Sequence, residues 1–205
     1  MRVIAASAHQ RVRWKNDGGW TTQLARDPAE GDAFRWRVSI AEIERAGPFS
    51  QYPGIDRELL LLDGNGIELD IDGAPPRRLD QRFAGVRFAG EARVECRLLG
   101  GPTRDFNVMV DRQSVRSETL GRPLVGSMLI FAAAGTEWLV HVLGGHVAVR
   151  HRDTTLALLG GATLHLDCRG ATATERVALD GGGELVLVKL TAHDIGKAAP
   201  HPTAA

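Results

Sequence analysis

Two arginines on separate apolar segments carry the clearest candidate chemistry in this sequence. Arg57 follows Asp56 and stands just before a run of leucines, and Arg37 lies in an alternating segment. A guanidinium presents a planar fork that binds a carboxylate through two parallel hydrogen bonds, so a pair of arginines suits a dicarboxylate. Asp56 would then orient an arginine or hold a backbone amide. The alternative for Arg57 is an exposed ion pair, which contributes only about 0–1 kcal/mol.

A glycine-containing loop, Lys15-Asn16-Asp17-Gly18-Gly19, is a second candidate anion site. Glycines allow the positive φ angles with which successive backbone N–H groups converge on an anion, and Lys15 and Asn16 add side-chain donors. The same composition is also typical of a plain hairpin turn. Both interpretations stay open on the residues alone.

Polar and apolar side chains alternate in Asp105-Phe106-Asn107-Val108-Met109. In a strand, the phenylalanine and valine then point into packing, while Asp105, Asn107 and Met109 share the opposite face. Inside a barrel, Asn107 would bind a ligand amide through its donor and its acceptor. The alternative is a buried network with a structural role.

The segment Arg35-Trp36-Arg37-Val38-Ser39-Ile40 alternates most clearly of all. Its tryptophan, valine and isoleucine share one face, and Arg37 and Ser39 share the other. The apolar face must meet a hydrophobic core. The polar face lines either solvent or a wet cavity, where the Ser39 hydroxyl would add a further hydrogen-bonding group.

The histidines do not predict a metal centre. His9 is the only histidine in the first half of the chain, and Arg57 would repel a divalent cation from its strand. The second half contains His141, His146, His151 and His165, without a nearby glutamate in ligand spacing. His141 and His151 would face one another across a hairpin turn. We predict no metal and no cofactor, and partly exposed histidines on strands.

The elements that must position these residues are short apolar segments. Turn signals separate them, such as Asp63-Gly64-Asn65-Gly66, Leu143-Gly144-Gly145 and Asp180-Gly181-Gly182-Gly183. Many short strands at this spacing are typical of an all-β sandwich or barrel. The segments predicted as strands are 35–43, 57–62, 66–71, 93–99, 106–110, 125–132, 138–143, 146–151, 154–158, 162–166, 171–178 and 184–191. Residues 80–83 and 192–197 are predicted to form short helices.

Two parts of the chain repeat one pattern. RELLLLDGNGIELDIDG and TEWLVHVLGGHVAVRHRD each run through a strand, a glycine turn and a second strand. Two copies of one β-unit fit this pattern better than one continuous sandwich. We predict a first barrel at residues 1–112, which carries the pocket, and a mainly structural second barrel at 113–205, with N-terminal strands that cross between the barrels.

The composition excludes several classes of protein. The 25 basic and 25 acidic residues balance, which does not suit a nucleic-acid or membrane surface. Cys96 and Cys168 lie far apart and form no CxxC motif, so neither a disulfide framework nor a zinc knuckle is expected. The beginning lacks the apolar core of a signal peptide. We expect a cytoplasmic protein, and a homodimer stays open.

Four motifs occur in a fixed order along the first half of the chain. They are WKNDGGWTT at 14–22, WRVS at 36–39, FSQYPGIDR at 49–57 and DFNVM at 105–109. In this order and spacing they resemble the HutD/Ves family of bacterial cupin-like proteins. The chain departs from the family pattern at Asp17, in place of a glycine, and at Trp20, which separates the glycines from the threonines.

The resemblance implies a bicupin, an all-β fold of two cupin-type barrels with few short helices. It also implies a link to histidine utilisation or stress response, and a small carboxylate ligand such as formylglutamate or formate. A non-catalytic or weakly catalytic binding role that modulates histidine catabolism is favoured. The alternatives are a cupin enzyme, metal-free or metal-dependent, that acts on a small carboxylate, and a regulator that binds another component of the pathway. The candidate ligand-binding residues are Arg57, Arg37, Ser39, Lys15, Asn16, Gly18, Thr22, Asp56, Asp105, Asn107 and Met109.

Overall fold

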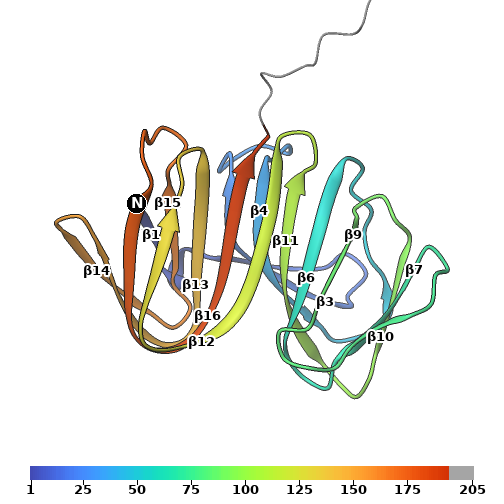
Figure 1. Cartoon of the computed structure of the whole chain (residues 1–205). Coiled ribbons are helices and arrows are strands. Elements are labelled where there is room, and N and C mark those ends of the chain that lie inside the picture. The colour runs from blue at the N-terminus through green and yellow to red at the C-terminus, as the bar shows by residue number, and fades with distance from the viewer. Residues whose placement is uncertain (194–205) are drawn as a thin grey trace, which may run out of the picture.

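The computed structural model describes residues 1–193, which form an all-β protein (Figure 1). Within that range the only helix is the 3-10 helix η1, Ala6–Ala8. The strands are β1 (Arg2–Ile4), β2 (Gln10–Arg13), β3 (Gly19–Asp27), β4 (Trp36–Ile43), β5 (Gly47–Pro48), β6 (Ile55–Asp63), β7 (Ile67–Ile71), β8 (Arg77–Leu79), β9 (Gly85–Ala89), β10 (Val94–Leu98), β11 (Thr103–Asp111), β12 (Val115–Ala132), β13 (Thr136–His151), β14 (Thr154–Leu159), β15 (Thr163–Asp167) and β16 (Glu175–Ala192). The predicted fold class is confirmed. No helix of the described part is long and apolar enough to cross a membrane.

Two sheets form the first barrel. One has the strand order β2-β3-β4-β11-β6-β9, and the other has the order β5-β10-β7-β8. Their facing sides enclose a buried cluster that includes Leu59 and Leu61 of β6 and Ile67 and Leu69 of β7. This packing explains the run of leucines after Arg57, because the strand is buried on both of its faces.

The third sheet, in the order β1-β15-β13-β16-β12 with β14 beside β13, folds over itself to form the second barrel. Its long strands curve through glycines, as Figure 1 shows for β12 and β16. Buried residues from both halves of β13, such as Val140 and Val149, belong to one core cluster. The described chain therefore contains two β-barrels, and their assignment as a bicupin stays an expectation of the resemblance.

Two of the predicted turns proved to be bends within strands. Leu143-Gly144-Gly145 lies inside β13, and Asp180-Gly181-Gly182-Gly183 lies inside β16. Gly145 has φ +91°, and a Cβ there would lie 2.1 Å from the carbonyl oxygen of Gly182. The glycines thus let two paired strands bend together at close approach. Because β13 runs through, the predicted meeting of His141 and His151 across a turn is wrong.

The barrels meet along a buried seam. The apolar face of β4, with Trp36 and Val38, and Phe106 of β11 pack against Val186 and Val188 of β16. This seam is the hydrophobic core that the alternation in β4 predicted. The opposite faces of β4 and β11 consequently point into the first barrel.

A partly buried ionic cluster also links the barrels. Arg35 donates a 2.8 Å hydrogen bond to Glu137 of β13, and a 2.5 Å bond to Asp27. Glu137 is 1% exposed and also pairs with His165 at 2.9 Å. The buried carboxylate is therefore compensated from both barrels.

Other elements differ from the prediction. Residues 80–83 form a turn rather than a helix, because Phe83 adopts φ +65° and donates its amide to the carbonyl of Leu61. Ala192 ends β16, and the rest of the predicted helix at 192–197 lies beyond His193, outside the described residues. The N-terminal strand β1 pairs with β15, so the chain begins in the sheet of the second barrel. The boundary at residue 112 stays a prediction.

Gly145→Ala should destabilise the fold strongly, because the new methyl group meets a backbone oxygen and the backbone conformation disfavours side chains. The conformational strain alone is about 1–3 kcal/mol. Gly144→Ala is the matched control, since its Cβ position is open. Urea unfolding measures both; equal midpoints for the two variants would contradict this account of the bend.

Candidate functional site

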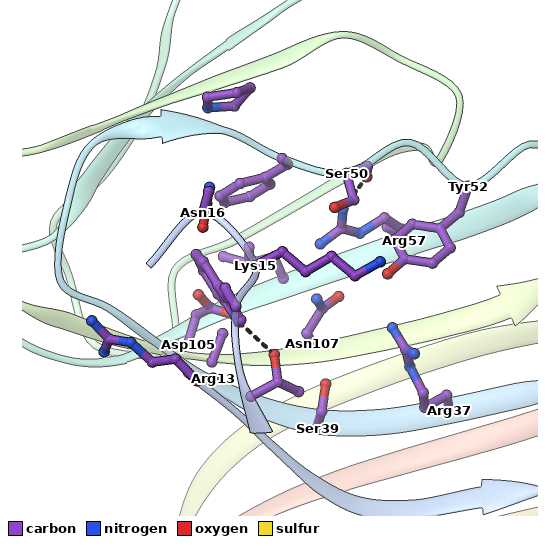
Figure 2. A pocket seen from close by; sticks show the side chains of 16 residues that line it. Arg13, Lys15, Asn16, Arg37, Ser39, Ser50, Tyr52, Arg57, Asp105 and Asn107 are labelled. Atoms are coloured by element: carbon purple, nitrogen blue, oxygen red, sulfur yellow. Dashed lines mark hydrogen bonds between the residues drawn. The ribbon is translucent and has the colours of Figure 1, made fainter. Parts of the chain in front are cut away.

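A cavity of about 570 Å³ opens into the first barrel (Figure 2). Both charged and apolar side chains line it, from the inner face of the large sheet and from the loops around its mouth. They are Arg13, Trp14, Lys15, Asn16, Thr21, Arg37, Ser39, Ala41, Pro48, Phe49, Ser50, Tyr52, Arg57, Leu59, Asp105 and Asn107. Cavities of this size accept small molecules.

Three neighbouring strands position the polar groups on the cavity floor. Met109 of β11 pairs with Arg37 of β4 on one side and with Arg57 of β6 on the other. Two residues along β11, Asn107 pairs with Ser39 on the same face. The strand register therefore brings both predicted arginines to one end of the cavity, in a row across the sheet.

Arg57 lies in an aromatic enclosure. Its side chain is 7% exposed, and the centroids of the Phe49, Tyr52 and Phe88 rings lie 5.3, 5.8 and 5.1 Å from its guanidinium carbon. Nη1 donates a long 3.4 Å hydrogen bond to the carbonyl of Ser50. The rings compensate part of the desolvation of the charge through cation–π interactions.

The charge of Arg57 has no counter-ion at contact distance among the described residues. Its Nε is buried without a hydrogen-bond partner. Burial lowers the pKa of Arg57, while the field of Asp105 acts in the opposite direction. A guanidinium nevertheless stays protonated in proteins, so the cavity contains an uncompensated cation.

Arg37 and Lys15 add positive charge at the same end. Nη2 of Arg37 donates to the Met109 sulfur at 2.9 Å, and its Nε is buried without a partner. Figure 2 shows Lys15 extending across the cavity toward Arg57 and Tyr52. Three cations thus converge on one volume, which favours an anion there.

Asp105 lies at a different end of the cavity, and Asn107 lies between it and Arg37. Asp105 is 0% exposed, and both of its oxygens are buried without a partner in the described structure. Burial raises the pKa of Asp105 to about 7, and the charge of Arg57 opposes this shift only in part. Oδ1 of Asn107 is also buried and unpartnered. Such groups are rare in folded proteins and indicate a missing hydrogen-bond partner.

The loop after β2 is held as a turn. The amide of Gly18 donates to Oδ1 of Asn16 at 3.1 Å, and Asp17 has φ +58°. Indole Nε1 of Trp14 donates to the hydroxyl of Thr21 at 2.8 Å. The Gly18 amide is therefore used within the loop, and Lys15 and Asn16 are the predicted loop residues that line the cavity.

The structure places four predicted residues outside the lining: Gly18, Thr22, Asp56 and Met109. Thr22 faces a smaller cavity between the barrels, since its neighbour Thr21 takes the inward position. Asp56 is exposed and accepts a 2.5 Å hydrogen bond from Arg112. Met109 is completely buried beneath Arg37.

The aromatic residues that surround Arg57 were not predicted from the sequence. Phe49 and Tyr52 precede Arg57 in the FSQYPGIDR motif, where the sequence indicated only a turn. Phe88 comes from β9, which pairs Phe88 with Arg57. The segment that forms β9 was not predicted as a strand.

The histidines lie apart from this cavity. His141 is 3% exposed, contrary to the prediction, and Nδ1 lies 2.9 Å from the hydroxyl of Thr163. Burial lowers its pKa to about 3. Within residues 1–193, no group of three or more His, Cys, Asp or Glu side chains is placed to hold a metal ion.

Asp105→Asn should alter how stability depends on pH. The pKa of Asp105 rises from 3.8 to about 7 on folding, so the folded state binds the proton more tightly between these values. The free energy of unfolding of the wild type should therefore fall, relative to the variant, as the pH rises from about 4 to about 7. Urea unfolding across this window measures the difference, and parallel profiles would contradict the assignment.

The comparisons with known proteins agree with the motifs. The family model described as HutD matches residues 6–187. An uncharacterised 21.2 kDa protein in the hutC 3′ region of Pseudomonas putida is 37% identical over 161 residues, which cover 78% of this chain and 83% of that protein. Protein Ves of Cronobacter sakazakii is 33% identical over 130 residues, 59% of this chain and 71% of its own length.

Solved structures agree as well. HutD from Pseudomonas fluorescens SBW25 superposes with a TM-score of 0.77 at 30% identity, over 94% of this chain and 98% of that one. A cupin 2 conserved barrel domain protein from Leptotrichia buccalis has a TM-score of 0.50 at 10% identity, over 84% and 88% of the two chains, a likeness of fold alone. The chain belongs to the HutD family.

Proposed function

We propose that this protein binds a small carboxylate in the cavity of the first barrel and, through that binding, modulates histidine catabolism without turning the ligand over. The observation that carries the proposal is the buried Arg57 guanidinium, which has no ion-pair partner among the described residues. A carboxylate would supply the missing counter-ion and accept two parallel hydrogen bonds. Candidate ligands are formylglutamate and formate.

The surroundings of Arg57 support an anion of more than one functional group. Arg37 and Lys15 lie on the same cavity, so a dicarboxylate would meet several cations. The volume of about 570 Å³ exceeds what formate fills. Ser39 and Asn16 would add neutral hydrogen bonds from opposite walls.

The relatives support a place near histidine utilisation. One relative is a protein of the hutC 3′ region in Pseudomonas putida, and the HutD structure from Pseudomonas fluorescens is described for a formate condition. These are properties of the relatives, and the link to this chain is part of the proposal.

Arg57→Gln should weaken binding of formylglutamate or formate by about tenfold to a hundredfold, because a hydrogen bond to a charged group contributes roughly 1.5–3 kcal/mol. For the wild type, a ligand at a hundred times its Kd should stabilise the fold by about 2.7 kcal/mol. Thermal shift and calorimetric titration with formylglutamate, formate, urocanate, glutamate and histidine measure both effects.

Arg97→Gln is the matched control, because its side chain is 73% exposed on β10 and takes no part in the cavity. It should bind like the wild type. The unliganded Arg57→Gln protein should be at least as stable as the wild type, since the substitution removes a buried unpaired charge. Failure of every carboxylate to bind, or equal binding by the Arg57 and Arg97 variants, would refute the proposed function.

A further inference from the structure

Asp105 is fully buried in the cavity wall. Binding of a ligand carboxylate by Arg57 does not by itself involve Asp105. It lies on β11 four residues from Met109, the strand neighbour of both arginines. That spacing is about 13 Å along a strand. Figure 2 shows Asp105 and Arg37 on opposite sides of Asn107. The cavity therefore has a cationic end and, some distance away, an end with buried oxygens that lack partners.

The groups that face Asp105 do not hold it as an ion. Of the cations around it, Arg57 of β6 acts on it most, yet burial outweighs that attraction and keeps the pKa of Asp105 near 7. Its carboxyl oxygens form no hydrogen bond with this arginine or with any other described residue. The other titratable groups near it or on the same cavity are Arg37 of β4, Arg13 of β2, Lys15 of the loop, Tyr52 and Cys96 of β10.

We propose that Asp105 is a specificity-determining residue, which binds a second polar group of the ligand by acting as a neutral carboxylic acid. The inference rests on the proposed function, because the ligand's carboxylate must first occupy the arginine end. A neutral acid donates through its O–H and accepts through its carbonyl. It pairs with a group that does both, such as an amide, and Oδ1 of Asn107 offers a further acceptor for an N–H.

Two consequences distinguish this role from a structural one. A carboxylate ligand that lacks the second polar group leaves Asp105 and Asn107 without hydrogen-bond partners. A site built around such hydrogen bonds strongly rejects an analogue that lacks the matching group. The bound ligand also keeps a proton on Asp105. Binding above pH 7 must then take up a proton from solution, and the affinity must fall as the pH rises.

Calorimetric titration of the full chain tests both consequences. The ligands are N-formylglutamate and glutarate, which lacks the formamido group, in two buffers of different ionisation enthalpy between about pH 6 and pH 9. The wild type should prefer N-formylglutamate, take up a proton near pH 8, and lose up to about tenfold in affinity per pH unit above pH 7.

Asp105→Asn and Asp105→Leu form a matched pair. The asparagine still donates and accepts, so this variant should keep the preference but bind with no proton uptake and no pH dependence. In the Asp105→Leu variant, the preference for N-formylglutamate over glutarate should fall by at least about tenfold. The thermal midpoint of each variant checks folding, and proton uptake by the wild type decides the matter if both variants unfold.

The outcomes separate the two proposals. If neither ligand binds the wild type at any pH, the proposed function fails and this inference falls with it. If N-formylglutamate binds the wild type without proton uptake, or with the pH dependence of the asparagine variant, Asp105 does not act as a neutral acid and this inference alone is overturned.

Discussion

A buried guanidinium without a counter-ion is the constraint on which the rest of the site depends. Burying a charge destabilises the folded protein unless other groups replace the lost hydration. Three aromatic rings and one distant carbonyl replace the hydration of the Arg57 guanidinium only in part. The strand that carries Arg57 is anchored by leucines on both faces, which fixes the backbone from which this side chain extends. A local loss of folding stability is typical of binding sites, where the bound ligand supplies the interactions that the folded protein lacks.

Strands β4 and β11 contribute to the cavity with one face and to the core between the barrels with the other, which connects the site to the packing of the whole molecule. On each strand, alternate residues enter the seam between the barrels and the cavity of the first barrel. A shift of one residue would exchange the two faces, and would place Trp36 in the cavity and Arg37 in the core. The apolar seam therefore sets the register, and the register places Arg37, Asn107 and Arg57 together.

Much of this arrangement could be predicted from the sequence where one physical rule dominated. Period-two alternation separated the packing face from the polar face in β4 and β11, and the short apolar segments between turn signals indicated the all-β class. The bends in β13 and β16 could not be predicted, since glycine pairs are equally typical of turns and only the facing strand shows that the chain continues. The strands β5 and β8, with two and three residues, are too short for a periodic signal.

The cavity itself was predicted less completely. Thr21 pairs with Ala41 on the cavity face, whereas Thr22 pairs with Ile40 on the opposite face, and this register is visible only once β3 and β4 are paired. Asp56 was predicted to belong to the site beside Arg57. Successive residues on a strand point to opposite sides, however, and Asp56 accepts a hydrogen bond from Arg112 of a distant segment. The unpartnered state of Asp105 depends on three strands at once, and so becomes visible only in the assembled barrel.

The pairing of β1 with β15 has a consequence for how the chain reaches this state. Arg2 lies opposite His165, so this pairing joins two segments that are far apart in the sequence. Contacts of such sequence separation slow folding. They also mean that β1 stays without its strand partner until β15 has formed.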